Sequence, residues 1–429
     1  MSALALYVIK AGYTVSGSDI SANDFTLSLE NLGAKIYYVH LAENVENADV
    51  IVYSSAIDKA NPELLRAKEL GVKIYERSAF LSLLLKRYDN VIGISGCHGK
   101  TTVTSMLTHI FVTARKQVTS FIGGQDAVYG NFLHGDSNEF CICEACEFKK
   151  NFLRLNPTLA VVTNVDSDHL DTYSSSEEIK KAYQEFATGK VTLYNADDVN
   201  SRYLFSGACF TFGIQENAQI RGVNLKCDAG YYSFSVSEYG VKRARIRLKI
   251  QGLHNVYNSL TAIAVARYYG VDYRYIKKAL ENFTGVKRRG ETLAVINGVK
   301  YVADYAHHPS EITATLKGVD KNETAILFQP HTFSRTKALK KEFVNALKEF
   351  DVAIYKTFPA RENFDAEGSA YSLYGELKKE NFSTEYLPDE RALTVYLNGK
   401  SKTKKQILFL GAGDLYSVAQ KYLSKKYKT

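Results

Sequence analysis

One segment of the chain has the residue types and spacing of a phosphate-binding loop. It contains Gly96-Cys-His-Gly-Lys-Thr-Thr102, and it lies between an apolar run at 90–95 and a predicted helix. In that setting, backbone N–H groups and the helix N-terminus can hold phosphate oxygens. Lys100 would reach the terminal phosphates and the Thr101 hydroxyl would hold Mg²⁺. The alternative is a glycine-rich turn without a ligand. The loop also departs from the strict Walker pattern, which would need glycine at position 94, where the chain has Ile94. The flanking strand and helix favour phosphate binding.

Carboxylates and a histidine follow two further predicted strands, 139–145 and 158–164. Glu144 and Glu147 come at the end of the first, and the second leads into a segment with Asp166, Asp168, His169 and Asp171. The carboxyl ends of parallel strands are where such sheets bind ligands. Carboxylate and imidazole ligands suit a second Mg²⁺ or Mn²⁺. Alternatively, the aspartates form turns and cap the next helix, and Glu144 is a solvated strand end.

Two asparagines could recognise a base. Asn255 and Asn258 follow Gly252-Leu-His254 near a predicted helix start, and their i, i+3 spacing places them on one helix face. An amide presents both a donor and an acceptor and could pair with adenine. The simpler reading is that an asparagine here caps the helix.

Two histidine-containing turns follow predicted strands in the last third of the chain. They are Asp304-Tyr-Ala-His307-His308-Pro-Ser310 and Gln329-Pro-His331-Thr-Phe-Ser-Arg335-Thr336. A lone histidine is usually structural, but six of the nine histidines lie in candidate site turns. Arg335 suits bidentate binding of a carboxylate.

The elements that would position these residues are those of α/β domains with largely parallel sheets. Apolar runs of about five residues alternate with helical patterns. The pattern predicts segments at 1–88, 89–285 and 286–429, with short alternating strands between 208 and 250 that form an antiparallel insertion or satellite sheet. The first segment opens in a helix, Ser2–Lys10, and resembles a nucleotide-binding sheet without its first strand.

Composition limits the class of protein. The chain has 429 residues, 45% of them apolar and 23% charged, which excludes a disordered chain and gives a prior of about three domains. No stretch approaches the ~18 apolar residues of a membrane span, and we expect no secretion signal and a cytoplasmic location. The net charge of +8 suits an anionic small substrate and does not require nucleic acid. Cys141, Cys143 and Cys146 are expected to be buried thiols of a strand rather than a metal site.

Together these motifs resemble the Mur ligase family, over essentially the whole chain and in the same order. The resemblance also rests on Ser16-Gly-Ser-Asp19, Ser54-Ser-Ala-Ile57 and Gly411-Ala-Gly-Asp414. It implies three domains: a truncated Rossmann-like domain for a UDP-sugar at 1–88, a central P-loop ATPase-like domain with a small antiparallel sheet at 89–285, and a Rossmann-like amino-acid domain at 286–429. It implies ATP-dependent amide formation in peptidoglycan synthesis, in which L-alanine joins UDP-N-acetylmuramate through an acyl phosphate.

The resemblance also implies a role for each matching residue. The ATP loop would comprise Gly96, Cys97, His98, Gly99, Lys100, Thr101 and Thr102, with His254 and Asn255 on the adenine–ribose side. Two Mg²⁺ ions would be held, one by Thr101 and the other by Glu144 and His169. The UDP-sugar would face Asp19, Ser55, Ala56 and His98. His307, His308 and Arg335 would close over the acyl phosphate and alanine. The catalytic set would be Lys100, His169, His308 and Arg335.

The chain departs from the family pattern at three places. The first strand and the glycine-rich turn for the UDP diphosphate are absent, and we interpret this as a start assigned too late. An upstream reading frame without such a turn would refute this interpretation. Cys97 replaces a usual threonine, which should matter little because the position offers mainly backbone. The carbamylated lysine of several sister ligases would fall at Tyr183, so we predict no carbamate.

Two rival functions remain. A related recycling ligase attaches a preformed peptide to the same sugar and shares the His-His-Pro turn. A non-catalytic nucleotide-binding regulator would have no need to keep Lys100, Thr101, Glu144, His169 and Arg335 together. Neither nucleic acid nor membrane insertion is expected.

Overall fold

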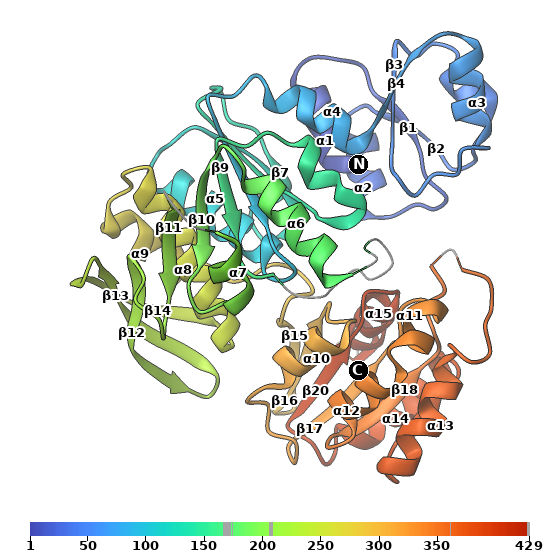
Figure 1. Ribbon diagram of the computed structural model, residues 1–429. Helices are drawn as coiled ribbons and strands as arrows, with labels where there is room; N and C mark the ends of the chain where they lie inside the picture. The colour runs from blue at the N-terminus through green and yellow to red at the C-terminus, as the bar shows by residue number, and fades with distance from the viewer. Residues whose placement is uncertain (166–172, 174, 206–208, 361, 427–429) are drawn as a thin grey trace. The chain divides into compact units, whose positions relative to one another are not determined.

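The computed structural model describes residues 1–165, 173, 175–205, 209–360 and 362–426 (Figure 1). Its contacts divide the chain into two compact units. The first comprises residues 1–226, 233–249 and 255–283, and the second comprises residues 227–232, 250–254 and 284–429. Among the described residues, no helix has both the length and the apolar character needed to cross a membrane.

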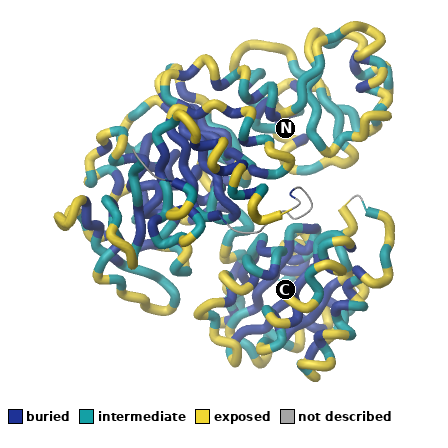
Figure 2. The backbone as a smooth tube through the Cα atoms, in the orientation of Figure 1, coloured by how far each residue is buried: buried dark blue, intermediate teal, exposed yellow. Residues whose placement is uncertain are grey.

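The N-terminal segment contains two separate pairs of parallel strands. Its elements are α1 (Ser2–Lys10), β1 (Ser16–Ser18), α2 (Asp24–Asn31), β2 (Lys35–Tyr37), η1 (Ala42–Val45), β3 (Val50–Tyr53), α3 (Pro62–Glu69), β4 (Lys73–Glu76) and α4 (Arg77–Leu85). β1 pairs only with β2, and β3 pairs only with β4. No strand within residues 1–89 joins the two pairs. None of the residues in these four strands is buried, as the teal and yellow tube in Figure 2 shows.

Two helices of this segment pack against the central domain. Leu4 and Tyr7 of α1 and Leu81 and Leu85 of α4 belong to the same hydrophobic cluster as residues of the central sheet. The helix α1 has the bounds expected from the sequence, whereas α4 was not predicted. Its sequence, RSAFLSLLL, has no regular amphipathic spacing that would indicate a helix.

The central domain is built on a ten-stranded sheet. The strand order is β14-β13-β12-β11-β10-β9-β5-β8-β6-β7, so β5 (Asn90–Ser95) lies between β9 (Leu159–Val162) and β8 (Phe140–Glu144). The remaining strands on that side are β6 (Val118–Asp126) and β7 (Gly130–Leu133). The core strands β5, β6, β8, β9 and β10 (Val191–Asn195) are parallel to one another, and the edge strand β7 is antiparallel to β6. Their carboxyl ends therefore lie along one edge of the sheet, where the motif residues follow them.

Helices cover both faces of this sheet. α5 (Lys100–Thr113) packs against β6, β8 and α9 (Tyr273–Asn282), and α8 (Leu253–Tyr268) packs beside α5. α6 (Ser176–Ala187), η2 (Phe148–Arg154) and α7 (Val199–Leu204) pack together. Cys141 and Cys143 are fully buried in β8, as predicted, and burial raises the pKa of Cys143 to about 12. Cys146 lies beyond the end of that strand and is half-buried.

The predicted antiparallel region extends the central sheet and does not form a separate one. β11 (Cys209–Gly213) pairs in parallel with β10 and with the start of β12 (Ile220–Asp228). Two-residue turns then connect β12 to β13 (Tyr231–Glu238) and β13 to β14 (Val241–Gln251). Both residues of each turn, Ala229-Gly230 and Tyr239-Gly240, have positive φ, as in type I′ hairpins. Such short turns join antiparallel strands.

The C-terminal domain has a six-stranded sheet covered by helices on both faces. The order is β15-β16-β20-β17-β18-β19, with β15 (Glu291–Ile296) antiparallel to β16 (Val299–Asp304) and the remaining pairs parallel. The parallel strands are β16, β20 (Gln406–Leu410), β17 (Thr324–Phe328), β18 (Asp351–Tyr355) and β19 (Glu385–Leu387). Successive residues of β17 alternate between two apolar clusters, one with α14 (Glu390–Lys400) and α15 (Leu415–Lys426), the other with α10 (Pro309–Leu316), α12 (Lys340–Leu347) and α13 (Ala370–Glu380). The dark blue strands of Figure 2 are typical of a sheet buried on both faces.

The sequence pattern predicts one helix at 337–349, but the structure has two helices in this region. α11 (Phe333–Ala338) ends before Leu339, whose φ of −112° interrupts the helix, and α12 follows. Thr332 begins α11 because its side chain accepts a hydrogen bond from the backbone N–H of Arg335. Arg335 therefore lies in the first turn of a helix rather than in the preceding loop.

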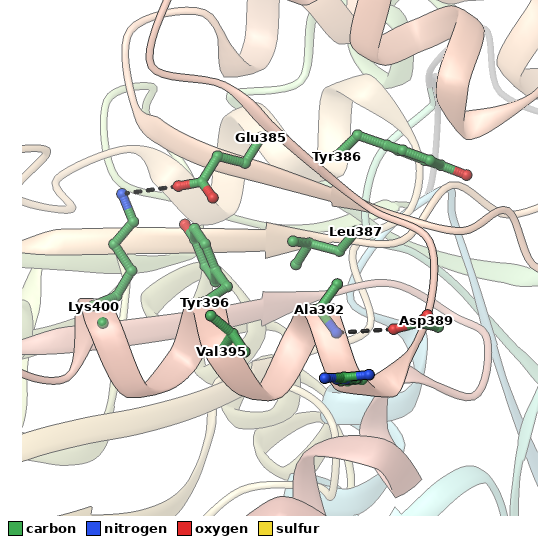
Figure 3. A pocket seen from close by; sticks show the side chains of 10 residues that line it. Glu385, Tyr386, Leu387, Asp389, Ala392, Val395, Tyr396 and Lys400 are labelled. Atoms are coloured by element: carbon green, nitrogen blue, oxygen red, sulfur yellow. Dashed lines mark hydrogen bonds and ion pairs between the residues drawn. The ribbon is translucent and has the colours of Figure 1, made fainter.

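A depression of 570 Å³ lies at the outer edge of the C-terminal sheet, between β19 and α14 (Figure 3). Its walls include Tyr386, Leu387, Ala392 and Val395. Lys400 at one end forms ion pairs with Asp351 (2.6 Å) and Glu385 (3.7 Å). None of the residues that the sequence singles out for chemistry lines this depression.

Candidate active site

The phosphate loop follows the central strand β5 and begins α5, as predicted. Gly96 and Gly99 have φ of 130° and 86°, and Gly99 is the N-cap residue of α5. A Cβ on Gly96 would collide with Thr163, and a Cβ on Gly99 would collide with the Oδ1 atom of Asn258. Glycine is therefore required at both positions by backbone conformation and by space. The loop can present its backbone closely to a ligand.

The end of β9 holds this loop in place. The Asn164 side chain accepts a hydrogen bond from the backbone N–H of His98 (2.9 Å) and donates one to its carbonyl oxygen (3.1 Å). The Thr163 hydroxyl also donates to the carbonyl oxygen of His98 (2.7 Å). The loop is thus tied to the neighbouring strand before any nucleotide binds.

Lys100, the first residue of α5, points back over the loop. Its Nζ atom donates to the carbonyl oxygens of Gly96 (2.5 Å) and Cys97 (3.3 Å) and lies 3.0 and 3.1 Å from the two carboxylate oxygens of Glu147. Burial opposes the charged ammonium, but the surrounding groups, with the Glu147 carboxylate first among them, together raise the pKa of Lys100 above its ordinary value. The ammonium is therefore charged and held at the loop.

Thr101 and Glu144 converge beside the loop. The Thr101 hydroxyl donates to Oε2 of Glu144 (3.2 Å), and the backbone N–H of Gly123 donates to Oε1 (2.5 Å). A hydroxyl and a carboxylate are hard oxygen ligands that fit Mg²⁺. Mg²⁺ usually binds through one or two carboxylates plus substrate phosphates. The described residues contain no group of three or more His, Cys, Asp or Glu side chains able to hold a metal by themselves.

The remaining metal candidate, His169, lies outside the described residues, as do Asp166, Asp168 and Asp171. Its expected role with Glu144 stays a prediction.

Asn255 and Asn258 are buried inside α8 and contact each other. The Asn258 side chain donates to Oδ1 of Asn255 (2.9 Å), and its own Oδ1 faces Gly99 of the loop. Asn255 is the third residue of α8 and not its cap, so the simple capping interpretation is wrong. The preceding His254 is exposed. The pair therefore extends the loop site toward α8, while adenine contact stays a prediction.

Tyr183 lies beside Cys97 of the loop. Tyr183 of α6 is fully buried, and its hydroxyl is 4.0 Å from Sγ of Cys97. Position 183 is thus filled by a phenol packed into the core, and the absence of a carbamate there stays a prediction.

The candidate UDP-sugar residues lie at the ends of strands in the N-terminal segment. Asp19 follows β1, and its backbone N–H donates to the carbonyl oxygen of Tyr37 (3.0 Å). Ser55 and Ala56 form a turn after β3. Lys149 of the central domain donates to the carbonyl oxygen of Ser55 (3.2 Å). The turn at Ser55 is therefore in contact with the segment that follows Glu147.

In the C-terminal unit, the His-His-Pro turn begins α10. His308 is the N-cap residue, and its Nδ1 atom lies 2.8 Å from Oγ of Ser310. Glu311 accepts hydrogen bonds from the backbone N–H groups of His307 (3.0 Å) and His308 (3.3 Å). His308 thus has a structural role in the turn, and its role in catalysis stays a prediction.

His331 and Arg335 bring unsatisfied polar atoms to the same turn region. The His331 ring lies 5.6 Å from that of His307 and stacks on Phe358 at 5.5 Å. Nδ1 of His331 and Nη1 of Arg335 are buried and have no hydrogen-bond partner within the described residues. Burial, with His307 and Arg335 nearby, lowers the pKa of His331 to about 4. A neutral imidazole and a guanidinium are therefore available to a polar, anionic ligand.

From the sequence, Glu147 is a candidate ligand of a second metal ion, whereas Asn164 and His331 are given no role. Each has a clear contact in the structure, with Lys100, His98 and His307 respectively. The available signal was their position at the carboxyl ends of parallel strands.

Family models match three consecutive parts of the chain. They are described as the Mur ligase family catalytic domain (residues 1–89), the Mur ligase middle domain (94–266) and the Mur ligase glutamate ligase domain (288–413). The chain therefore belongs to the Mur ligase family, whose members are ATP-dependent ligases. The exact domain limits 1–88, 89–285 and 286–429 stay a prediction.

Particular relatives are similar along their whole length. The chain is 38% identical to a UDP-N-acetylmuramate–L-alanine ligase of Acetivibrio thermocellus, over 99% of this chain and 94% of the relative. It is 38% identical to the enzyme of the same name from Caldicellulosiruptor saccharolyticus, over 99% and 96%. The crystal structure of UDP-N-acetylmuramate-alanine ligase from Thermotoga maritima superposes with a TM-score of 0.86 at 26% identity, covering 100% of this chain and 96% of that chain. A murein peptide ligase of Psychrobacter arcticus, at 22% identity and a TM-score of 0.73 over 99% and 96%, shares the fold.

Proposed function

We propose that this protein joins L-alanine to UDP-N-acetylmuramate in peptidoglycan synthesis, with conversion of ATP to ADP and phosphate. The observation that carries the proposal is the 38% identity to ligases of this name over 99% of the chain. The site is consistent with it, because the loop, Lys100, Thr101 and Glu144 lie together at the carboxyl edge of the central sheet. An ATP-consuming reaction also fits the predicted cytoplasmic location.

The chemistry requires no nucleophile from the protein. The muramate carboxylate would attack the γ-phosphorus of ATP, so that an O–P bond forms and ADP leaves. The alanine amine would then attack the acyl carbon, forming the amide and releasing phosphate. Catalysis of such transfers depends on positioning and charge neutralisation. In this proposal the charged Lys100 ammonium offsets charge on the transferred phosphoryl group, and the N–H groups of the loop hold its oxygens.

Mg²⁺ would neutralise phosphate charge when bound. The residues that would hold it are Thr101 and Glu144, with His169 as the predicted third ligand. Mn²⁺ could occupy the same oxygens.

The histidine turns supply the remaining groups in this proposal. Arg335 and the turn with His307 and His308 would bind the carboxylate of alanine and the acyl phosphate. The observation behind this assignment is the buried Nη1 of Arg335, which has no hydrogen-bond partner among the residues that the structure describes and lies near the neutral His331. The adenine–ribose contacts are assigned to His254 and Asn255, and the UDP-sugar contacts to Asp19, Ser55, Ala56 and His98.

The test is phosphate release by the purified chain in the presence of ATP and Mg²⁺, with each of the other substrates omitted in turn. We expect release only when both UDP-N-acetylmuramate and L-alanine are present. Release with a tripeptide but not with L-alanine would instead identify a peptide-recycling ligase. Nucleotide binding without any release would favour the non-catalytic regulator.

A further inference from the structure

Glu147 has a buried charge that the proposed chemistry leaves unused. It lies three residues beyond the end of β8, and its side chain is 1% exposed. Both of its carboxylate oxygens are within 3.1 Å of the Lys100 ammonium, which comes from an element 47 residues away in the chain. A buried carboxylate is costly unless it is paired, so this contact requires an explanation.

The contact fixes where the lysine points. An ammonium has three N–H donors, and Lys100 directs them to the carbonyl oxygens of Gly96 and Cys97 and to Glu147. A free lysine side chain carries about 2 kcal/mol of rotamer entropy. Glu147 is the one charged acceptor among the three, so its contact with the ammonium is the strongest of them. When a phosphate oxygen replaces a loop carbonyl, Glu147 can still hold the nitrogen in place.

The backbone around Glu147 is itself restrained. Its carbonyl oxygen accepts hydrogen bonds from the hydroxyl of Tyr173 (2.7 Å) and from the backbone N–H of Lys150 (2.9 Å). Lys149 and Lys150 both have positive φ, 52° and 55°, which turns the chain sharply after Glu147. Non-glycine residues in this conformation are energetically unfavourable and cluster at functional sites. The carboxylate is thus presented to Lys100 from a rigid support.

We propose that Glu147 is a positioning residue that holds the Lys100 ammonium ready for the terminal phosphates of ATP. This inference rests on the proposed function, because it assigns Lys100 to ATP. Glu147 acts through Lys100 and has no direct part in bond formation. A purely structural ion pair would affect stability but not the affinity of the folded protein for a nucleoside triphosphate.

The test compares Glu147→Gln, Lys100→Met and the double variant, using adenylyl-imidodiphosphate with Mg²⁺ as the probe. Glutamine keeps the shape and an acceptor oxygen but loses the charge-assisted bond. We expect the Glu147→Gln variant to bind the probe about tenfold more weakly and to lose about tenfold in kcat, with KM for L-alanine unchanged. In the Lys100→Met background, Glu147→Gln should add less than about a twofold change, since its effect operates through the lysine.

Two further variants keep the test decisive. Glu147→Asp retains the charge on a shorter side chain and should bind the probe with intermediate affinity. Glu177→Gln removes one partner of the exposed Glu177–Lys180 pair (2.9 Å) and should leave probe affinity and kcat unchanged. Thermal unfolding of each variant separates loss of fold from loss of affinity.

The inference is overturned if the folded Glu147→Gln variant has the probe affinity and the kcat of the wild type. If the Glu147→Gln variant does not fold, wild-type probe affinity in Glu147→Asp has the same meaning. The inference also fails if Glu147→Gln weakens probe binding as much in the Lys100→Met background as in the wild type. Failure of the wild-type protein to ligate L-alanine would instead count against the proposed function.

Discussion

The side chain of Asn164 bonds both backbone polar groups of one residue, His98. Its Oδ1 atom accepts from the His98 N–H at 2.9 Å, and its Nδ2 atom donates to the His98 carbonyl oxygen at 3.1 Å. This two-point contact links the end of β9 to the phosphate loop, which follows the neighbouring strand β5. The loop conformation therefore depends on a residue that need not touch the nucleotide.

Asn164→Asp should loosen this link, because a carboxylate cannot donate to the His98 carbonyl oxygen and would repel it. We expect KM for ATP to rise about tenfold, because a tenfold change corresponds to the free energy of one charged or buried hydrogen bond. Steady-state kinetics with ATP as the varied substrate measure this. The control is Asn381→Asp, since Asn381 also bonds a backbone carbonyl (Phe350, 2.6 Å) and a backbone N–H (Ser383, 3.1 Å), but in the C-terminal domain. Equal ATP kinetics in the two variants would contradict the role of Asn164.

Gly99→Ala should abolish nucleotide binding. Alanine there would be strained at a φ of 86° and would collide with Oδ1 of Asn258. Gly130→Ala is a matched control, because Gly130 has a φ of 67° but open space around its Cβ position. The control should lose about 1 kcal/mol of stability from strain and keep its ATP affinity. Titration with a fluorescent ATP analogue distinguishes them, and tight binding by Gly99→Ala would exclude the loop as the phosphate site.

Glu144→Gln should increase the Mg²⁺ concentration needed for activity. The carboxylate lies 3.2 Å from the Thr101 hydroxyl, and replacing it by an amide removes one charge from the proposed metal site. We expect the concentration for half-maximal activity to rise at least about tenfold, and EDTA to stop the wild-type reaction reversibly. An unchanged Mg²⁺ dependence would place the metal elsewhere.

Asp126 should make stability depend on pH. It is 2% exposed and accepts hydrogen bonds from Ser105 and from the backbone N–H groups of Val128 and Tyr129, while Nε2 of His109 lies 3.0 Å from it. Burial alone would raise its pKa, but these bonds lower the pKa below the ordinary 3.8. Its stabilising contribution is therefore present above the unfolded pKa and is lost as pH falls through the lower, folded pKa.

Asp126→Asn should accordingly reduce the free energy of unfolding at pH 7 by about 2 kcal/mol. The deficit should shrink as the pH drops below about 4, where the carboxyl of the unfolded chain becomes protonated while that of the folded protein is still charged. Urea unfolding at several pH values measures this. A deficit that is the same at pH 7 and at pH 3 would show that the charge of Asp126 does not contribute.

Local signals in the sequence were sufficient to predict several elements. The bounds of α1 match the predicted Ser2–Lys10, because a glycine at position 12 follows the helix closely. The phosphate loop was also predictable, because the spacing of its glycine, lysine and threonine residues is typical of phosphate binding. The break at Leu339 was not, because it depends on a helix that starts early, at Phe333, after the capping residue Thr332.

Pairing between distant segments was the part that the sequence could not supply. The joining of β11 and β12 to the central sheet depends on register with β10, and no local pattern encodes that register. The contact between Glu147 and Lys100 could not be predicted for the same reason, because α5 and the end of β8 come together only in the folded sheet. Asn255 was misjudged as a possible cap because helix boundaries are weakly marked, and α8 begins two residues earlier.

The central claim is that the muramate carboxylate is activated by phosphorylation, and an isotope measurement tests it most directly. UDP-N-acetylmuramate labelled with ¹⁸O in its carboxylate would be incubated with the protein, MgATP and L-alanine, and the phosphate analysed by mass spectrometry. The account predicts one ¹⁸O atom in each phosphate released, in step with amide formation. Amide formed with unlabelled phosphate, or phosphate released without amide, would contradict it.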